Sequence, residues 1–310
     1  MTLQDLLTHA QRAETGVPDW MLGFFKRRSI SFANGATDST THVCWLQSRN
    51  FTIDLRLPLA EHQPPLRSWA EYSVDELAVL ANHEGWEALS EWDGETLAWH
   101  GETSLQLHNR WPEPAVLHRI GNCMIEFAPS GAYVEDWRLQ PSKPGPLIGL
   151  RLIEERNLDT GELRHRGGGL IVCGDYAALV LGRAEAVSGT SLRDEVRRAA
   201  GDTRRLASLF NFETSVACGS INDGYHVSLS TCAGRLGEPL LPADGFEVIA
   251  GGQQVIQRLS IDGARCERRF TIDTIEAELS YAQSTGFTAQ AAAWYASESP
   301  TLARYTEPQF

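Results

Sequence analysis

The segment FTIDLRLP, residues 51–58, places an acid and a base two residues apart in a strand-like alternation. Because successive side chains of a strand point to opposite faces, one face is wholly apolar, and Asp54 and Arg56 share the other. This pattern suits a strand with a solvent-facing polar side, or a barrel whose interior is partly polar. In a barrel, we expect Arg56 to face a carboxylate or carbonyl of a bound molecule, with Asp54 holding the guanidinium in place.

Tryptophans could supply the apolar wall of such a barrel. The first 140 residues contain Trp45, Trp86, Trp92, Trp99, Trp111 and Trp137. Packing in the core and under barrel rims explains them most simply, since tryptophan fills such positions and its N–H finds a partner there. The functional interpretation is a ligand cavity with a few orienting polar groups. In that interpretation Trp45, Trp99 and Trp137 line the ligand.

Catalysis in the same cavity would require a general acid or base, for which Asp54 and His108 are the candidates. Beyond these, Glu126 and Asp136 could face the same interior, whereas Glu135 and Asp136 point to opposite faces. None of the nine histidines belongs to H-E-x-x-H or H-x-H, and no G-x-S-x-G is present. We therefore assign no metal ligand, and no cofactor is implied.

Short strand-like segments separated by tight turns fill most of the chain. Asp93-Gly94, Gly251-Gly252 and Asp262-Gly263 are typical hairpin turns. Strands are expected near 28–33, 42–48, 51–57, 86–92, 96–100, 103–108, 122–128, 132–139, 147–156, 163–173, 175–184, 211–218, 224–231, 246–250, 253–261 and 264–273. Such a series indicates an antiparallel meander that closes into a barrel.

A few short helices interrupt the strands. Residues 1–14 have apolar side chains at helical spacing, and Ser73-Val-Asp-Glu76 is a capping box. Ser191 can cap an arginine-rich helical segment over 191–206, which Gly201-Asp202 can break. This segment is a solvated face supported by an Asp194–Arg198 pair, or a surface that docks a partner.

Composition excludes several classes of protein. The 310 residues carry a net charge of -13, which disfavours binding to nucleic acids and anionic membranes. No apolar run is long enough to span a membrane, and the first residues do not form a signal peptide, so we expect a cytoplasmic protein. The six cysteines are widely spaced without a C-x-x-C pair, and we interpret them as reduced, buried small hydrophobes.

Three stretches carry a family resemblance: WLQSRNFTIDLRLP, GNCMIEFAPSGAYVEDWRLQP and GGLIVCGDYAALVLGR. Together they resemble a family of poorly characterised bacterial and fungal proteins with lipocalin-like (calycin) barrels, over roughly residues 40–185. The resemblance implies such a barrel and a cavity that can take a small molecule. It transfers no catalytic residue.

The sequence thus predicts a mainly β protein with a lipocalin-like antiparallel barrel and a second β-rich region. We place the barrel domain and an N-terminal helix in residues 1–188, and a linking helix and second β-rich domain in 189–310. The leading hypothesis is binding of a small, partly apolar molecule. The alternatives are a cofactor-independent lyase, hydratase or isomerase in the same cavity, and a structural or interaction protein that uses the helix at 191–206. The oligomeric state is left open.

Overall fold

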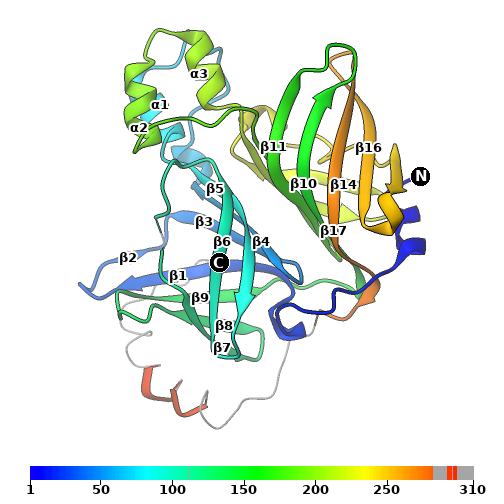
Figure 1. Cartoon of the computed structure of the whole chain (residues 1–310). Helices are drawn as coiled ribbons and strands as arrows, with labels where there is room; N and C mark the ends of the chain where they lie inside the picture. The colour runs from blue at the N-terminus through cyan, green and yellow to red at the C-terminus, as the bar shows by residue number, and fades with distance from the viewer. Residues whose placement is uncertain (111, 282–291, 295, 299–310) are drawn as a thin grey trace.

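The computed structural model describes residues 1–110, 112–281, 292–294 and 296–298. Its strands form two antiparallel sheets and its helices are short (Figure 1), so the predicted mainly β architecture is confirmed. Trp111, named above with the other tryptophans, lies outside the described residues. Within the described ranges, no helix combines the length and the apolar character needed to cross a membrane.

The first sheet closes on itself. Strand β1 pairs with β3 on one side and with β9 on the other, which makes a closed antiparallel barrel of eight strands with the short β2 outside it. In sheet order the strands are β2 (Thr37–Asp38), β1 (Gly23–Phe32), β3 (Thr41–Gln47), β4 (Phe51–Pro58), β5 (Glu84–Trp92), β6 (Thr96–Ser104), β7 (Ala115–Ile120), β8 (Cys123–Phe127) and β9 (Tyr133–Leu139).

The second sheet also has eight strands, but its two edge strands do not pair with each other. In sheet order they are β14 (Gly224–Ser230), β13 (Glu213–Ser220), β12 (Tyr176–Arg183), β11 (Leu163–Cys173), β10 (Gly145–Asn157), β17 (Ala264–Leu279), β16 (Gln254–Ile261) and β15 (Phe246–Ile249). Backbone hydrogen bonds cover both edges: Leu240 donates to Tyr225 beside β14, and Phe246 of β15 donates to Met1. This sheet has an apolar core of its own, which includes Leu150, Phe270 and the N-terminal Leu6.

The apolar face of β4 points out of the barrel and toward the second sheet. A Cβ built on Gly149 of β10 or on Gly169 of β11 would lie within 3.1 Å of the Phe51 ring, so these glycines allow the close approach. Ile53 and Leu55 of β4 belong to the same buried cluster as residues of β11 and β12. Each buried side chain of this size contributes about 2 kcal/mol, so this contact does much to hold the two sheets together.

The division between the sheets differs from the predicted boundary at residue 188. The chain leaves the barrel after Leu139 and enters the second sheet at Gly145, so β10, β11 and β12 belong to the second sheet. Hydrophobic alternation identifies a strand but does not indicate which sheet it joins. The N-terminal helix is a 3-10 turn, Gln4–His9, and its Leu6 packs in the second sheet's core rather than on the barrel.

Two of the strand predictions were wrong in detail. Strand β7 was missed, because its inward positions include the buried Arg119 and its pattern is therefore not apolar. The predicted strands 96–100 and 103–108 are instead the single strand β6, which ends at Ser104. The glycines of β11 lie at a bulge, since the register against β12 shifts between His165 and Gly168.

Three helices gather beyond one end of the barrel (Figure 1). Helix α1 (Val74–Leu80) begins with the predicted capping box, and the arginine-rich segment forms α2 (Leu192–Arg198) and α3 (Thr203–Leu209). Both α2 and α3 lie between β12 and β13, which pair within the second sheet, so they do not link two domains as predicted.

Two arginines of α2 pair within their own helix. Arg197 contacts Asp194 and Arg198 contacts Glu195, each three residues back, in place of the expected Asp194–Arg198 pair. Local ion pairs thus satisfy Arg197 and Arg198, in keeping with a solvated helix face. All six cysteines are free; Cys218 is exposed and the other five are partly or fully buried.

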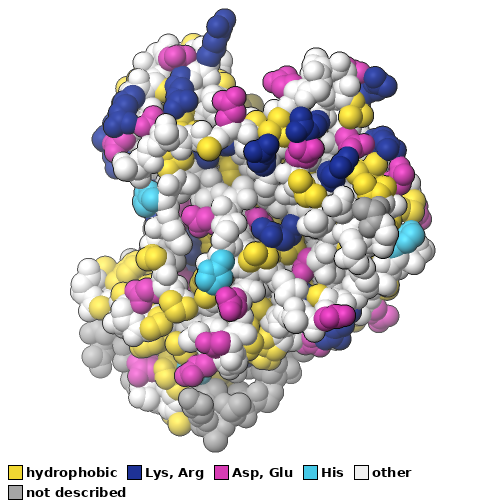
Figure 2. Space-filling model, in the orientation of Figure 1, with side chains coloured by type: hydrophobic (Ala, Val, Ile, Leu, Met, Phe, Trp, Pro, Cys, Tyr) yellow, Lys and Arg dark blue, Asp and Glu magenta, His cyan; other side chains and the backbone are white. Residues whose placement is uncertain are grey.

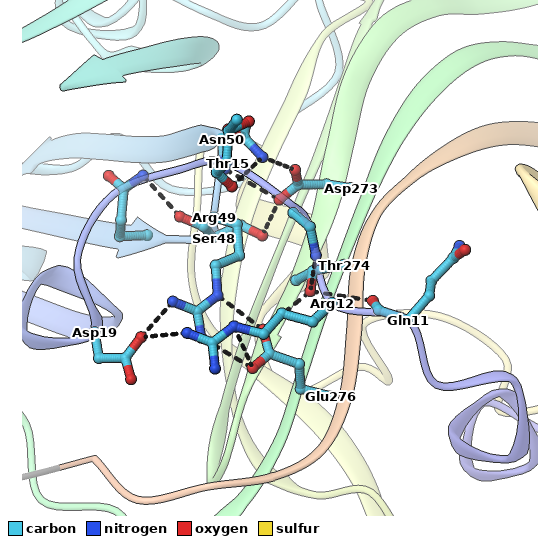
Figure 3. Close-up of polar contacts among 12 residues, drawn as sticks. Gln11, Arg12, Thr15, Asp19, Ser48, Arg49, Asn50, Asp273, Thr274 and Glu276 are labelled. Carbon is cyan, nitrogen blue, oxygen red and sulfur yellow. Dashed lines mark hydrogen bonds and ion pairs between the residues drawn. The ribbon is translucent and has the colours of Figure 1, made fainter. Parts of the chain in front are cut away.

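A polar junction joins the barrel to the second sheet at the β3–β4 turn (Figure 3). Ser48 Oγ donates to Asp273 Oδ2 at 2.6 Å, and Asn50 Nδ2 donates to Asp273 Oδ1 at 2.8 Å. Between them Arg49, only 3% exposed, donates to both carboxylate oxygens of Glu276 at 2.8 and 2.9 Å and also contacts Asp19. The turn between β3 and β4 therefore anchors the barrel to the second sheet.

Removal of the Glu276 carboxylate should leave the buried Arg49 guanidinium without its bidentate partner. We expect Glu276→Ala to lower the free energy of unfolding by about 3 kcal/mol, measured by urea denaturation. The control is Arg12→Ala, whose exposed side chain makes only outer contacts with the same group and should cost less than about 1 kcal/mol. Equal effects of the two substitutions would contradict the anchoring role.

Candidate ligand-binding cavity

The barrel encloses a cavity near the end at which the helices gather. Its lining includes every candidate named from the sequence: Trp45, Asp54, Arg56, Trp99, His108 and Trp137. Strand register explains the convergence, because Trp45, Asp54 and Trp86 are direct cross-strand partners on β3, β4 and β5. Residues that share a register position on adjacent strands point to the same face of the sheet, here the inside.

The cavity is small and opens at one side. About 40 Å³ is open to the centres of water-sized molecules, where a single water requires roughly 10–15 Å³. The space therefore suits a few waters or one small ligand. Glu102 of β6 and His108 and Asn109 of the following segment are exposed lining residues, and they mark the opening.

Four tryptophans form a connected wall. Ring centroids lie 6.0 Å apart for Trp86 and Trp99, 5.8 Å for Trp99 and Trp45, and 5.3 Å for Trp45 and Trp137, all edge to face. Three of the indole N–H groups are held. Trp45 donates to Gln47, Trp99 donates to Thr52, and Trp137 donates to Glu126. The wall is thus apolar and fixed in orientation.

Asp54 and Arg56 form the ion pair that their shared face predicted. Arg56 Nε donates to Asp54 Oδ1 at 2.9 Å, and Nη2 donates to Oδ2 at 3.3 Å. Burial raises the pKa of Asp54 to about 6, against the opposing effect of Arg56. The carboxyl is therefore mostly ionised at neutral pH and holds the guanidinium at the cavity wall.

Sequence reasoning missed the more unusual pair, Glu126 of β8 and Glu135 of β9. They are cross-strand partners, so both point inward, and the expectation that Glu126 and Asp136 share the interior is wrong. Asp136 instead pairs with Arg138. Hairpin register decides which carboxylates face one another, and the turn sequence PSG did not specify that register.

The two glutamates have different partners. Glu135 accepts from Arg27 at 2.7 Å, and Arg27 also contacts Asp38. Glu126 accepts only from the neutral Tyr133 hydroxyl at 3.1 Å and from the Trp137 indole at 3.0 Å, and no ion pair to it is found among the described residues.

Burial, and next the Glu135 carboxylate, raise the pKa of Glu126 to about 8. Its carboxyl is therefore mainly protonated at neutral pH.

The acid–base candidate His108 lies at the opening rather than among the buried groups. His108 interacts electrostatically with Glu102: partial burial raises the pKa of the Glu102 carboxyl, and His108 opposes that shift. No group of three or more His, Cys, Asp or Glu in the described ranges is arranged to hold a metal ion. The lining residues that the sequence did not indicate include Thr52, Glu84, Ser104, Gln106, Arg110, Tyr133 and Glu135.

The distribution of charge over the surface agrees with the acidic interior. In the view of Figure 2, Lys and Arg side chains gather over the helices and the second sheet, while the barrel face carries mainly Asp and Glu. The acidic character is thus shared by the barrel face and the cavity within it.

Similarity to known proteins is low and carries no argument about this chain. The chain matches no family model, and no curated protein matches it. Among solved structures, the uncharacterized protein YLR301w from Saccharomyces cerevisiae is similar at 13% sequence identity and a TM-score of 0.44, over 82% of this chain and 98% of that chain.

The raised pKa of Glu126 has a consequence for stability. A folded-state pKa above the unfolded value means that the folded protein binds the proton more tightly, so this group's contribution to stability falls as pH rises toward 8. We expect the free energy of unfolding of Glu126→Gln, relative to that of the wild type, to rise by up to about 1.4 kcal/mol per pH unit between about pH 5 and 8. Urea denaturation across that range measures the difference.

Asp136→Asn, on the outer side of β9, is the matched control. The difference between its free energy of unfolding and that of the wild type should stay constant over the same pH range. If the free energy of unfolding of Glu126→Gln differed from that of the wild type by a constant amount across this range, the raised pKa of Glu126 would be contradicted.

Proposed function

We propose that this protein binds a small, partly apolar molecule inside its barrel. The observation that carries the proposal is the convergence of four tryptophans and several buried charged groups on one enclosed cavity. Apolar walls with a few oriented polar groups are the usual composition of small-molecule sites. A solidly packed core would have no need for buried carboxyls, whose burial costs free energy.

Each group has a defined part in this proposal. Trp45, Trp99 and Trp137 contact the apolar part of the ligand, since their N–H groups are already engaged within the protein. Arg56, held by Asp54, donates to an oxygen of the ligand at the cavity wall. The opening beside His108 provides the entrance.

The lipocalin-like character and the location belong to the same proposal. A closed antiparallel barrel of eight strands supports the sequence resemblance to lipocalin-like (calycin) proteins, whose barrels enclose one small ligand. Six free cysteines are in keeping with a reducing compartment such as the cytoplasm.

A second candidate function is acid–base catalysis, favoured by one observation. Asp54 and Glu126 line the same cavity, and their pKa values, about 6 and about 8, lie on opposite sides of neutrality. Such a separation is typical of a base and an acid that work together. A lyase, hydratase or isomerase would use Glu126 as the acid and Asp54 as the base. Loss of turnover with retained binding in Glu126→Gln would distinguish it from a carrier.

The proposal predicts that filling the cavity abolishes binding. Ser104→Trp introduces an indole from the lining of β6, whereas the control Glu91→Trp introduces one at an exposed position on β5. Native mass spectrometry of gently purified protein, followed by a fluorescence screen of small fragments, measures occupancy. We expect wild type and Glu91→Trp to hold the same compound or fragments and Ser104→Trp to hold none.

Thermal unfolding of Ser104→Trp establishes that the variant is folded. If no compound or fragment distinguishes the wild type from the folded Ser104→Trp protein, the binding function is contradicted.

A further inference from the structure

We propose that the ligand carries a positive charge, and that its cationic group lies between the tryptophan wall and Glu126. This inference rests on the proposed binding function and names its ligand class: small quaternary or alkyl ammonium compounds. Three independent features support it, namely the balance of charge in the cavity, the aromatic wall and the partners of Glu126.

The cavity has more acidic than basic groups. Five carboxyl side chains line it, on β4, β5, β6, β8 and β9, against the two guanidinium groups of Arg56 and Arg110. These two arginines already pair with Asp54 and Glu84. Arg27 approaches Glu135 from β1. Five carboxyl groups thus face three guanidinium groups, and with Glu126 protonated four carboxylates still face three cations, so a bound cation improves the balance and a bound anion worsens it.

Glu126 is a buried carboxyl for which the described residues show no ion pair. Its side chain faces the cavity, the residue is 5% exposed, and its two hydrogen-bond partners, Tyr133 and Trp137, are uncharged. A buried carboxylate without a cation is costly, so in the empty cavity the group retains its proton. A ligand cation beside it would supply the missing charge and release that proton to solvent.

The tryptophan wall suits the same ligand class. Aromatic faces attract cations through their quadrupole, and tryptophan does so most strongly. The buried wall removes the ligand from water, which strengthens this attraction. Quaternary ammonium groups are weakly hydrated and apolar at their surface, so they meet both requirements of the site, an aromatic wall and a nearby negative charge.

Proton release makes cation binding depend on pH in a defined direction. The groups that act on Glu126 are Glu135 on its partner strand β9, which raises its pKa, and Arg56 on β4, which lowers it. Asp54 beside that arginine has a pKa of about 6. Above that value and below about pH 8, affinity for a cation should fall about tenfold for each unit that the pH is lowered.

Three probes of nearly equal shape separate charge from shape: choline, its neutral isostere 3,3-dimethylbutan-1-ol and the anion 3,3-dimethylbutanoate. Choline is positive at every pH, so any pH dependence comes from the protein. Isothermal titration calorimetry at about pH 9 should show choline binding at least about tenfold tighter than the alcohol, with the anion weakest.

The Glu126→Gln variant should bind choline about tenfold more weakly at that pH and lose the pH dependence, while its affinity for the alcohol stays unchanged. Asp136→Asn removes a carboxylate from the outer face and should leave all three affinities unaltered. Equal or tighter binding of the alcohol, tightest binding of the anion, or no binding of any probe would overturn the inference. The cavity-filling test with Ser104→Trp would then still decide the proposed function, because it does not depend on the charge of the ligand.

Discussion

The pairing of β1 with β9 is the constraint on which the site depends. Seven residue pairs join these strands and close the first sheet. Closure turns one face of every strand inward, and Arg27 of β1 thereby meets Trp137 of β9 in register. Without it, Glu126 would lie on an open sheet in water, where its carboxyl would not hold a proton near neutral pH. The shape and the unusual electrostatics of the cavity thus share one origin.

The second sheet stabilises the barrel from outside, and the barrel interior can therefore be partly polar. Barrel strands such as β4 direct their large apolar residues outward, and β10, β11 and β12 bury them. Part of the hydrophobic stabilisation therefore lies outside the barrel, while the inside holds tryptophans, carboxyls and a cavity. The junction of Arg49 with Glu276 fixes the turn between β3 and β4, the two strands that carry Trp45 and Asp54.

Local pattern was enough to predict much of this arrangement. Alternation in FTIDLRLP showed that Asp54 and Arg56 share a face, and the tryptophans named for the cavity do line it. Pattern could not predict what depends on contacts distant in sequence. The sheet to which β10–β12 belong, the strand β7 with its buried Arg119, and the Glu126–Glu135 pairing all follow from tertiary register.

The central claim is that the barrel holds a buried carboxyl without a cationic partner, aimed at a ligand cavity. The direct measurement is carbon-13 NMR of protein labelled at the glutamate carboxyl, titrated with pH, with Glu126→Gln to assign the signal. The account predicts that the Glu126 carboxyl titrates near pH 8 in the unliganded protein. Titration near the ordinary glutamate value of about 4.3 would contradict it.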